Sequence, residues 1–125
     1  MNERQLTALL GGFAGAEAGY PFGPGAQVWK VGGRIFAIVG EDSRPLEVSL
    51  KCDPDLAEEL RAAFPELVRP GYHLNKRHWN TVRADAPRAE LREWVELSYE
   101  LVFGSLPKRV REAIDAAASV RQPEG

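Results

Sequence analysis

QVWKVGGRIFAIV, residues 27–39, contains two runs of mainly β-branched and aromatic residues on either side of a glycine pair. Tight hairpin turns need positive φ angles, which glycine adopts without a steric penalty. We therefore expect residues 27–31 and 34–39 to form an antiparallel hairpin around Gly32-Gly33. Trp29 would oppose Phe36 across this turn, as a core pair or, alternatively, as an exposed surface on which nucleic-acid bases stack.

The chain after this hairpin predicts one more strand and then a helix. Apolar and polar residues alternate from Leu46 to Cys52, which is the pattern of a half-buried strand. Asp53-Pro54 predicts a helix start, because aspartate caps helices well and proline suits their first turn. The expected buried stripe of this helix is Leu56, Leu60 and Phe64, and Pro65 would end it.

Residues 67–75 and 76–84 are predicted to form a second hairpin. With Asn75-Lys76 as a two-residue turn, His73 faces His78 and Tyr72 faces Trp79. A three-residue turn over residues 75–77 would instead place His73 opposite Trp79. In the first register the side expected to face the core holds Tyr72, Leu74, Trp79 and Thr81. The side expected to be exposed holds His73, His78 and Asn80.

Three further helices are predicted, at residues 5–13, at residues 85–103 and from Pro107 onward. The helix of residues 85–103 is expected to bury Leu91, Trp94, Val95, Ser98, Leu101 and Val102. The order α-β-β-β-α-β-β-α, with a final short helix, predicts a two-layer α+β fold in which one antiparallel sheet packs on helices. We expect a single domain over residues 1–125, fraying over about residues 118–125.

Charge is distributed unevenly along a chain whose net charge is only −2. Residues 67–84 carry four Lys or Arg side chains and both histidines but no acid, and residues 18–40 also lack acids. By contrast, residues 53–66 hold five acids and one arginine, and residues 85–100 hold five acids and two arginines. Two basic hairpins would offer a positive edge to an anionic partner. Alternatively, strands simply tolerate few acids and carry basic tips that discourage aggregation.

The basic side chains are the candidate nucleic-acid contacts, with phosphates as their targets. The candidates are Lys30, Arg34, Arg69, His73, Lys76, Arg77, His78 and Arg83. No catalytic residue, cofactor or metal site is predicted, because two histidines are too few for a specific zinc site and neither has a nucleophile or carboxylate nearby in sequence. We therefore expect a protein that is not an enzyme.

The cellular compartment follows from what the sequence lacks. Cys52 is the one cysteine, so no intramolecular disulfide is expected and the thiol is predicted to be buried. No apolar run reaches the roughly 20 residues of a membrane span. Residues 1–10 also lack the pattern of a signal peptide. We therefore expect a cytoplasmic protein without a membrane partner.

Several short motifs resemble, in the same order, those of the MmcQ/YjbR family. They are Phe22-Gly23-Pro24, VWKVGGRIFA at residues 28–37, LKCDP at 50–54, PGYHLNKRHWNTV at 70–82, and SYELV at 98–102 followed by Leu106-Pro107. Arg34 stands where a lysine is expected and keeps the charge. The resemblance implies a YjbR-like fold, α-β(3)-α-β(2)-α, which is similar to that of secretion chaperones. It also implies DNA binding through wing-like hairpins.

Three hypotheses about function remain open at this point. The first is a non-enzymatic DNA-binding protein that contacts phosphates weakly through its basic hairpins. The second is a protein-interaction module, chaperone-like or dimerising, with an exposed apolar patch around Trp29, Phe36 and Ile38. The third is a binder of small anionic ligands at His73, His78 and Asn80. DNA and protein are thus the expected partners, and the chain would be a monomer or a weak dimer.

Overall fold

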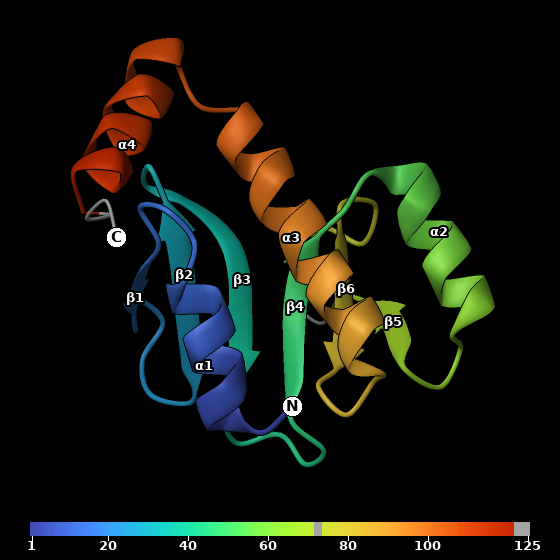
Figure 1. Ribbon diagram of the computed structural model, residues 1–125. Coiled ribbons are helices and arrows are strands. Elements are labelled where there is room, and N and C mark those ends of the chain that lie inside the picture. The colour runs from blue at the N-terminus through green and yellow to red at the C-terminus, as the bar shows by residue number, and fades with distance from the viewer. Residues whose placement is uncertain (72–73, 122–125) are drawn as a thin grey trace.

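The computed structural model describes residues 1–71 and 74–121 (Figure 1). The elements are α1 (Glu3–Gly11), β1 (Glu17–Gly19), β2 (Ala26–Val31), β3 (Arg34–Gly40), β4 (Glu47–Lys51), α2 (Pro54–Ala63), β5 (Val68–Pro70), β6 (Trp79–Arg83), α3 (Arg88–Gly104) and α4 (Lys108–Arg121). The strands form one antiparallel sheet in the order β1-β2-β3-β4-β6-β5. The predicted α+β class with its antiparallel sheet is confirmed.

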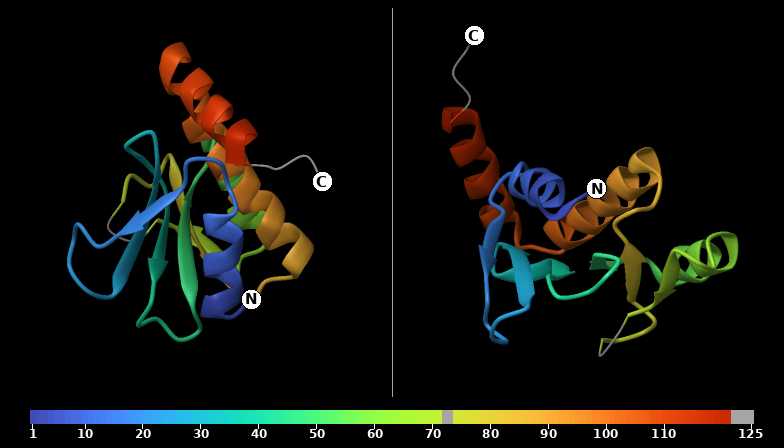
Figure 2. Two further views of the ribbon diagram at one scale, coloured as in Figure 1. Left: turned by 60° about the vertical axis from the view of Figure 1, so that its left-hand side comes forward. Right: turned by 90° about the horizontal axis from the view of Figure 1, so that it is seen from below.

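Helices and sheet form two layers. Seen from below, α1, α2 and α3 lie on one side of the sheet, and among the described elements the other side carries no helix (Figure 2). The core fills the space between the layers, where Leu6 and Leu10 of α1, Leu91 and Val95 of α3, and Phe36 of β3 are fully buried. None of the described helices is long and apolar enough to cross a membrane.

The first hairpin forms as predicted, but its register differs. Gly32 and Gly33 turn with φ angles of 56° and 81°, which glycine adopts readily. A bulge between Trp29 and Lys30 pairs Trp29 with Ala37, so the predicted Trp29–Phe36 pair is wrong. Both aromatic rings are nevertheless in the core, with 6% and 0% of their surfaces exposed. The apolar patch expected around them therefore does not exist on the surface.

The bulged end of β3 needs a side chain to complete the sheet. The β3–β4 pairing ends at Ala37 and Leu50. Beyond this point the hydroxyl of Ser98 on α3 donates to the carbonyl oxygen of Phe36 (2.6 Å) and accepts from the N–H of Lys51 (2.9 Å). The fully buried Ser98 thus bridges two strands that no longer reach each other directly.

The second hairpin pairs β5 with β6, but the predicted two-residue turn is wrong. Val68 pairs with Val82 and Pro70 with Asn80, and residues 76–78 form a turn ahead of β6. Tyr72 and His73 lie outside the described residues, so the pairings predicted for these two residues stay predictions. The register also shifts by one residue, which turns the side chain of Asn80 into the core rather than outward.

The helices largely follow their predicted faces. Asp53 caps α2 and Pro54 begins it, as expected. In α2, however, Ala57 is the buried residue, while the predicted stripe is only half-buried. In α3 the prediction for Leu101 is wrong, since this residue is 42% exposed. Cys52 is buried as predicted, and α4 continues to Arg121, so residues 122–125 of the expected frayed segment lie outside the described chain.

Candidate nucleic-acid interface

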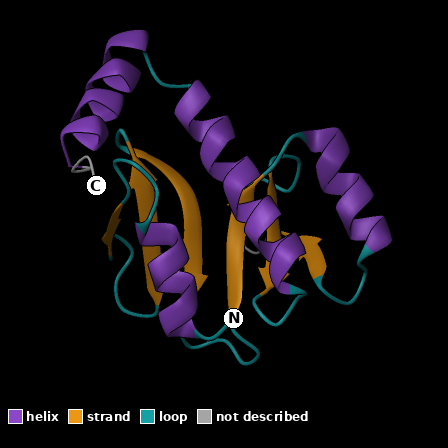
Figure 3. Cartoon of the chain, in the orientation of Figure 1, coloured by secondary structure: helices purple, strands orange, loops and turns teal. Residues whose placement is uncertain are grey.

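The topology brings the two basic turns to the same end of the sheet. Strands β2, β4 and β5 finish at this end and β3 and β6 begin there, because Lys51 pairs with Trp79 and Val31 pairs with Arg34 (Figure 3). The start of α4 follows from the same end of α3. We call this region the basic end, and it comprises Lys30, Arg34, Lys51, Lys76, Arg77 and Arg109.

Lys76 and Arg77 lie on a segment that is held in place by hydrogen bonds from α2. Arg61 of α2 donates from Nε to Oδ1 of Asn80 (2.7 Å) and from Nη2 to the carbonyl oxygens of Trp79 (3.2 Å) and Lys76. Asn80 in turn donates to the carbonyl oxygen of Ala57 (3.3 Å). The guanidinium of Arg61 is therefore engaged in hydrogen bonds within the protein. These hydrogen bonds fix the position of the segment that carries Lys76 and Arg77.

Short-range hydrogen bonds complete the shape of this segment. The N–H of Arg77 donates to Oδ1 of Asn75 (3.0 Å), and that of His78 to the Asn75 carbonyl oxygen (3.2 Å). Nζ of Lys76 lies 3.3 Å from the carbonyl oxygen of Gly71. The side chains of Lys76 and Arg77 are exposed, whereas His78 is half-buried. Both side chains are thus accessible on a hydrogen-bonded turn, although the ammonium group of Lys76 folds back toward Gly71.

A shallow hollow of about 410 Å³ lies between this segment, the end of β4 and the end of α3. Lys51, Asn75, His78 and Ser105 supply polar groups to its wall, and Asp53 adds one carboxylate. Arg34 reaches the same place from β3, donating from Nη1 to the carbonyl oxygen (2.7 Å) and Oγ (3.0 Å) of Ser105. The guanidinium of Arg34 is therefore partly used in tying β3 to the end of α3.

Two of the candidate nucleic-acid contacts form ion pairs with carboxylates instead. Arg69 forms a bidentate ion pair with Glu47 (2.9 and 3.1 Å), and Arg83 forms one with Asp85 (2.7 and 2.9 Å). The hydrogen bond from Arg83 lowers the pKa of Asp85 and raises the pKa of Arg83 itself. The structure thus separates Arg69 and Arg83 from the other candidates.

Glu47, Asp85 and Asp42 lie at the opposite end of the sheet. Arg83 pairs with Glu47 across the β4–β6 ladder, and Asp85 follows β6 directly. Asp42 lies in the β3–β4 connection and approaches Gly25 at the start of β2. At this end of the sheet the cations of Arg69 and Arg83 are therefore matched by carboxylates.

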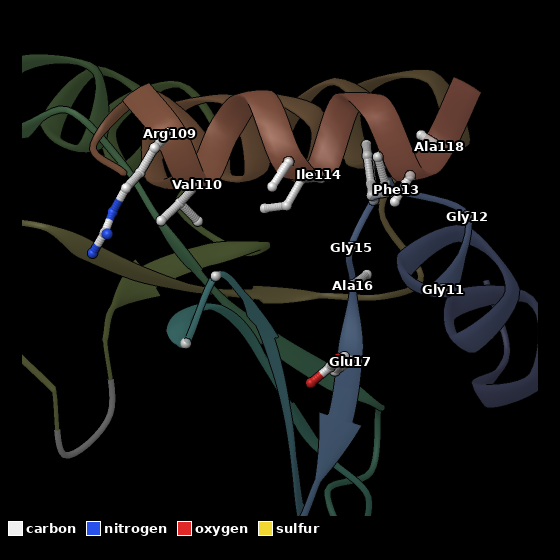
Figure 4. Close-up of a pocket in the computed structure, with 15 residues that line it drawn as sticks. Gly11, Gly12, Phe13, Gly15, Ala16, Glu17, Arg109, Val110, Ile114 and Ala118 are labelled. Carbon is white, nitrogen blue, oxygen red and sulfur yellow. The ribbon is translucent and has the colours of Figure 1, made fainter. Parts of the chain in front are cut away.

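A larger hollow of about 850 Å³ lies between α4 and the segment that joins α1 to β1. Figure 4 shows Val110 and Ile114 on the side of α4 that faces the hollow, and Gly15 packs against Ile114. Most of the lining consists of glycine, alanine and aliphatic side chains, so the hollow offers few groups for recognition. Arg109 and the Gly32-Gly33 turn share it, which places Arg109 at the basic end.

Sequence reasoning missed Lys51 and Arg109 as members of this surface. Lys51 stands on the polar side of the alternating strand at residues 46–52, so its exposure was evident but its neighbours were not. Arg109 belongs to the last helix, whose position depends on long-range packing. His73 lies outside the described residues, and the anion site expected at His73, His78 and Asn80 loses Asn80 to the core.

Fold and charge together define a class, namely a small α+β protein with helices on one face of an antiparallel sheet and cations at one sheet end. The chain belongs to the YjbR family, whose family model matches residues 11–101. It is 40% identical over 87 residues to "Uncharacterized protein YjbR" of Escherichia coli K12, covering 68% of this chain and 73% of that protein. It is 35% identical over 97 residues to "Uncharacterized protein YbdF" of Escherichia coli O157:H7, covering 76% and 79% of the two chains.

Two solved structures share the fold. The crystal structure of Deinococcus radiodurans protein DR2400 superposes with a TM-score of 0.84 at 36% identity, covering 90% of this chain and 86% of that one. A protein from Pseudomonas syringae superposes with a TM-score of 0.68 at 23% identity, covering 82% and 99%. At the lower identity the likeness concerns the fold alone.

Proposed function

We propose that this protein is a non-enzymatic DNA-binding protein that holds phosphates weakly at its basic end. The observation that supports the proposal most is the meeting of both basic turns at one end of the sheet. Among the described residues, no salt bridge engages Lys30, Lys51, Lys76 or Arg77. Lys30 does lie opposite Glu17 in the β1–β2 pairing, and Lys76 contacts the carbonyl oxygen of Gly71. Cations gathered at one end of the sheet can bind a phosphate backbone without reading its sequence.

The salt dependence of binding tests this proposal quantitatively. Four phosphate contacts on duplex DNA predict a slope of about −3.6 for log K against log salt concentration, or roughly a 100-fold loss of affinity between 50 and 200 mM NaCl. Fluorescence anisotropy with a labelled 20-base-pair duplex, and with one of its strands, measures both the affinity and the slope.

Charge reversal at the basic end provides the matched comparison. Lys76→Glu with Arg77→Glu should abolish binding at 50 mM NaCl. The control, Arg4→Glu with Arg88→Glu, changes the net charge equally at two exposed helical positions outside the basic end and should retain most of the affinity. Equal losses in the two double variants would show that only net charge matters. No binding by the wild-type protein would sink the proposal.

A further inference from the structure

Two leucines on α3 have exposed side chains although both side chains are large and apolar. Leu97 is 38% and Leu101 is 42% exposed, and they lie one turn apart. Leu97 lines a small cavity together with Trp94 of α3 and with Leu56 and Leu60 of α2. We call this strip the α2–α3 groove, and its lining residues are Leu56, Leu60, Trp94, Leu97 and Leu101.

The groove is closed at one end and open at the other. Phe64 and Trp94 touch with ring centroids 5.1 Å apart, so α2 and α3 meet at the end of α2. Toward the start of α2 they diverge, and Leu101 there lines the shallow hollow beside Pro54. The exposed leucines thus extend the small apolar cavity along α3 and form a candidate contact surface.

The rim of this groove is acidic along the outer sides of α2 and α3, while its open end meets Lys51 and Asp53 of the shallow hollow. By the 100° spacing of a helix, Glu93 and Glu100 lie next to the two exposed leucines on the outer side of α3. Glu59 takes the matching place beside Leu56 and Leu60 on α2. All three glutamates are exposed, and none takes part in a salt bridge among the described residues. Arg61, the basic residue of α2, points toward Asn80 instead.

We propose that the α2–α3 groove binds a basic amphipathic helix of a partner protein. Aliphatic side chains at positions i, i+3 and i+4 of such a helix fit a leucine-lined groove. Lysine or arginine on its flanks would pair with the three glutamates. A second copy of this chain, docked through the same face, would bring acid against acid, and nucleic acid would be repelled.

The chain's own basic helix does not fill the groove. Helix α4 has the right composition, with Lys108, Arg109 and Arg111 around Val110 and Ile114. Its apolar side instead packs at the opposite edge of the molecule, where Ile114 meets Gly15 (Figure 4). The groove therefore stays open to an external helix, and its binding does not depend on the function proposed for the basic end.

Two synthetic helices that differ only in charge provide the probe. Both carry leucine at positions i, i+3, i+4 and i+7 over 14 residues, one with lysine and the other with glutamate elsewhere. Fluorescence anisotropy of the labelled peptides against the full chain should show that the lysine peptide binds at least roughly tenfold more tightly than the glutamate peptide.

Variants then locate the site. Leu97→Ser with Leu101→Ser should weaken the lysine peptide roughly tenfold, because truncating two central apolar contacts removes most of such an interface. The control, Phe22→Ser with Val120→Ser, removes two residues that are 68% and 85% exposed elsewhere and should leave binding unchanged. Glu93→Lys with Glu100→Lys should reverse the peptide preference.

Three results would overturn the proposal. The first is equal affinity for both peptides, and the second is unchanged binding in the Leu97 and Leu101 variant. The third is a wild-type dimer in sedimentation equilibrium that this variant dissociates, since the occupant would then be a second copy. Urea unfolding of each variant checks that the fold is retained, which is expected because the replaced residues are exposed.

Discussion

The hydroxyl of Ser98 joins β3, β4 and α3, and replacing Ser98 with alanine tests what this hydroxyl contributes to stability. The change removes the partner of the Phe36 carbonyl and of the Lys51 N–H, both at a site where the serine is 0% exposed. Leaving a buried polar group unpaired costs about 1–3 kcal/mol. Alanine returns roughly 0.5 kcal/mol through its higher helix propensity. With two groups left unpaired, the net loss of unfolding free energy should therefore be about 1.5–5.5 kcal/mol.

Urea unfolding followed by circular dichroism measures this loss, with thermal unfolding as a second reading. For a chain of this length about 1 kcal/mol corresponds to roughly 4 °C, so the midpoint should fall by about 6–22 °C. The control is Ser119→Ala on α4, an exposed serine in a helix, which should change stability by less than about 0.5 kcal/mol. If both variants unfold at the same urea concentration, the bridging role of Ser98 is refuted.

Three further predictions rest on other contacts. Asn80→Ala should lower the unfolding free energy by about 2 kcal/mol in urea titrations, because Arg61 loses its buried acceptor, and an unchanged midpoint would contradict this. Burial raises the pKa of the Cys52 thiol, so Ellman's reagent at pH 8 should react slowly with the folded protein and rapidly once urea unfolds it; fast labelling without urea would argue against it. Arg83 lowers the pKa of Asp85, so this pair stabilises the fold above the unfolded value of about 3.9 and is lost as the pH falls through the folded pKa. Carboxyl NMR should therefore give Asp85 a midpoint below that value in the wild-type protein and a higher one in Arg83→Ala, and identical midpoints would speak against the coupling.

Local signals were sufficient for most of the elements. The glycine pair at residues 32–33 determines a turn, and Asp53-Pro54 determines a helix start, because both depend on the backbone preferences of neighbouring residues. Strand β1 was missed for the opposite reason. Glu17–Gly19 follows a glycine-rich stretch and becomes a strand only through pairing with β2.

The register of the second hairpin and the grouping of cations at the basic end depend on contacts between residues far apart in the sequence. The one-residue shift in the second hairpin reverses the direction of Asn80, whose burial depends on Arg61 and on the backbone of α2. The basic end likewise depends on β4 lying beside β6, which brings Lys51 next to the segment of Lys76. The individual cations were visible in the sequence, but their grouping follows only from the strand order.

The two outermost strands of the sheet are each only three residues long, β1 at one side and β5 at the other. β5 ends in Pro70, which has no N–H to donate. An incoming strand would find too few backbone groups to pair with on either side, so recognition by strand addition is disfavoured. Contacts through side chains are favoured instead, and single substitutions can change the affinity and selectivity of such contacts without rebuilding the sheet.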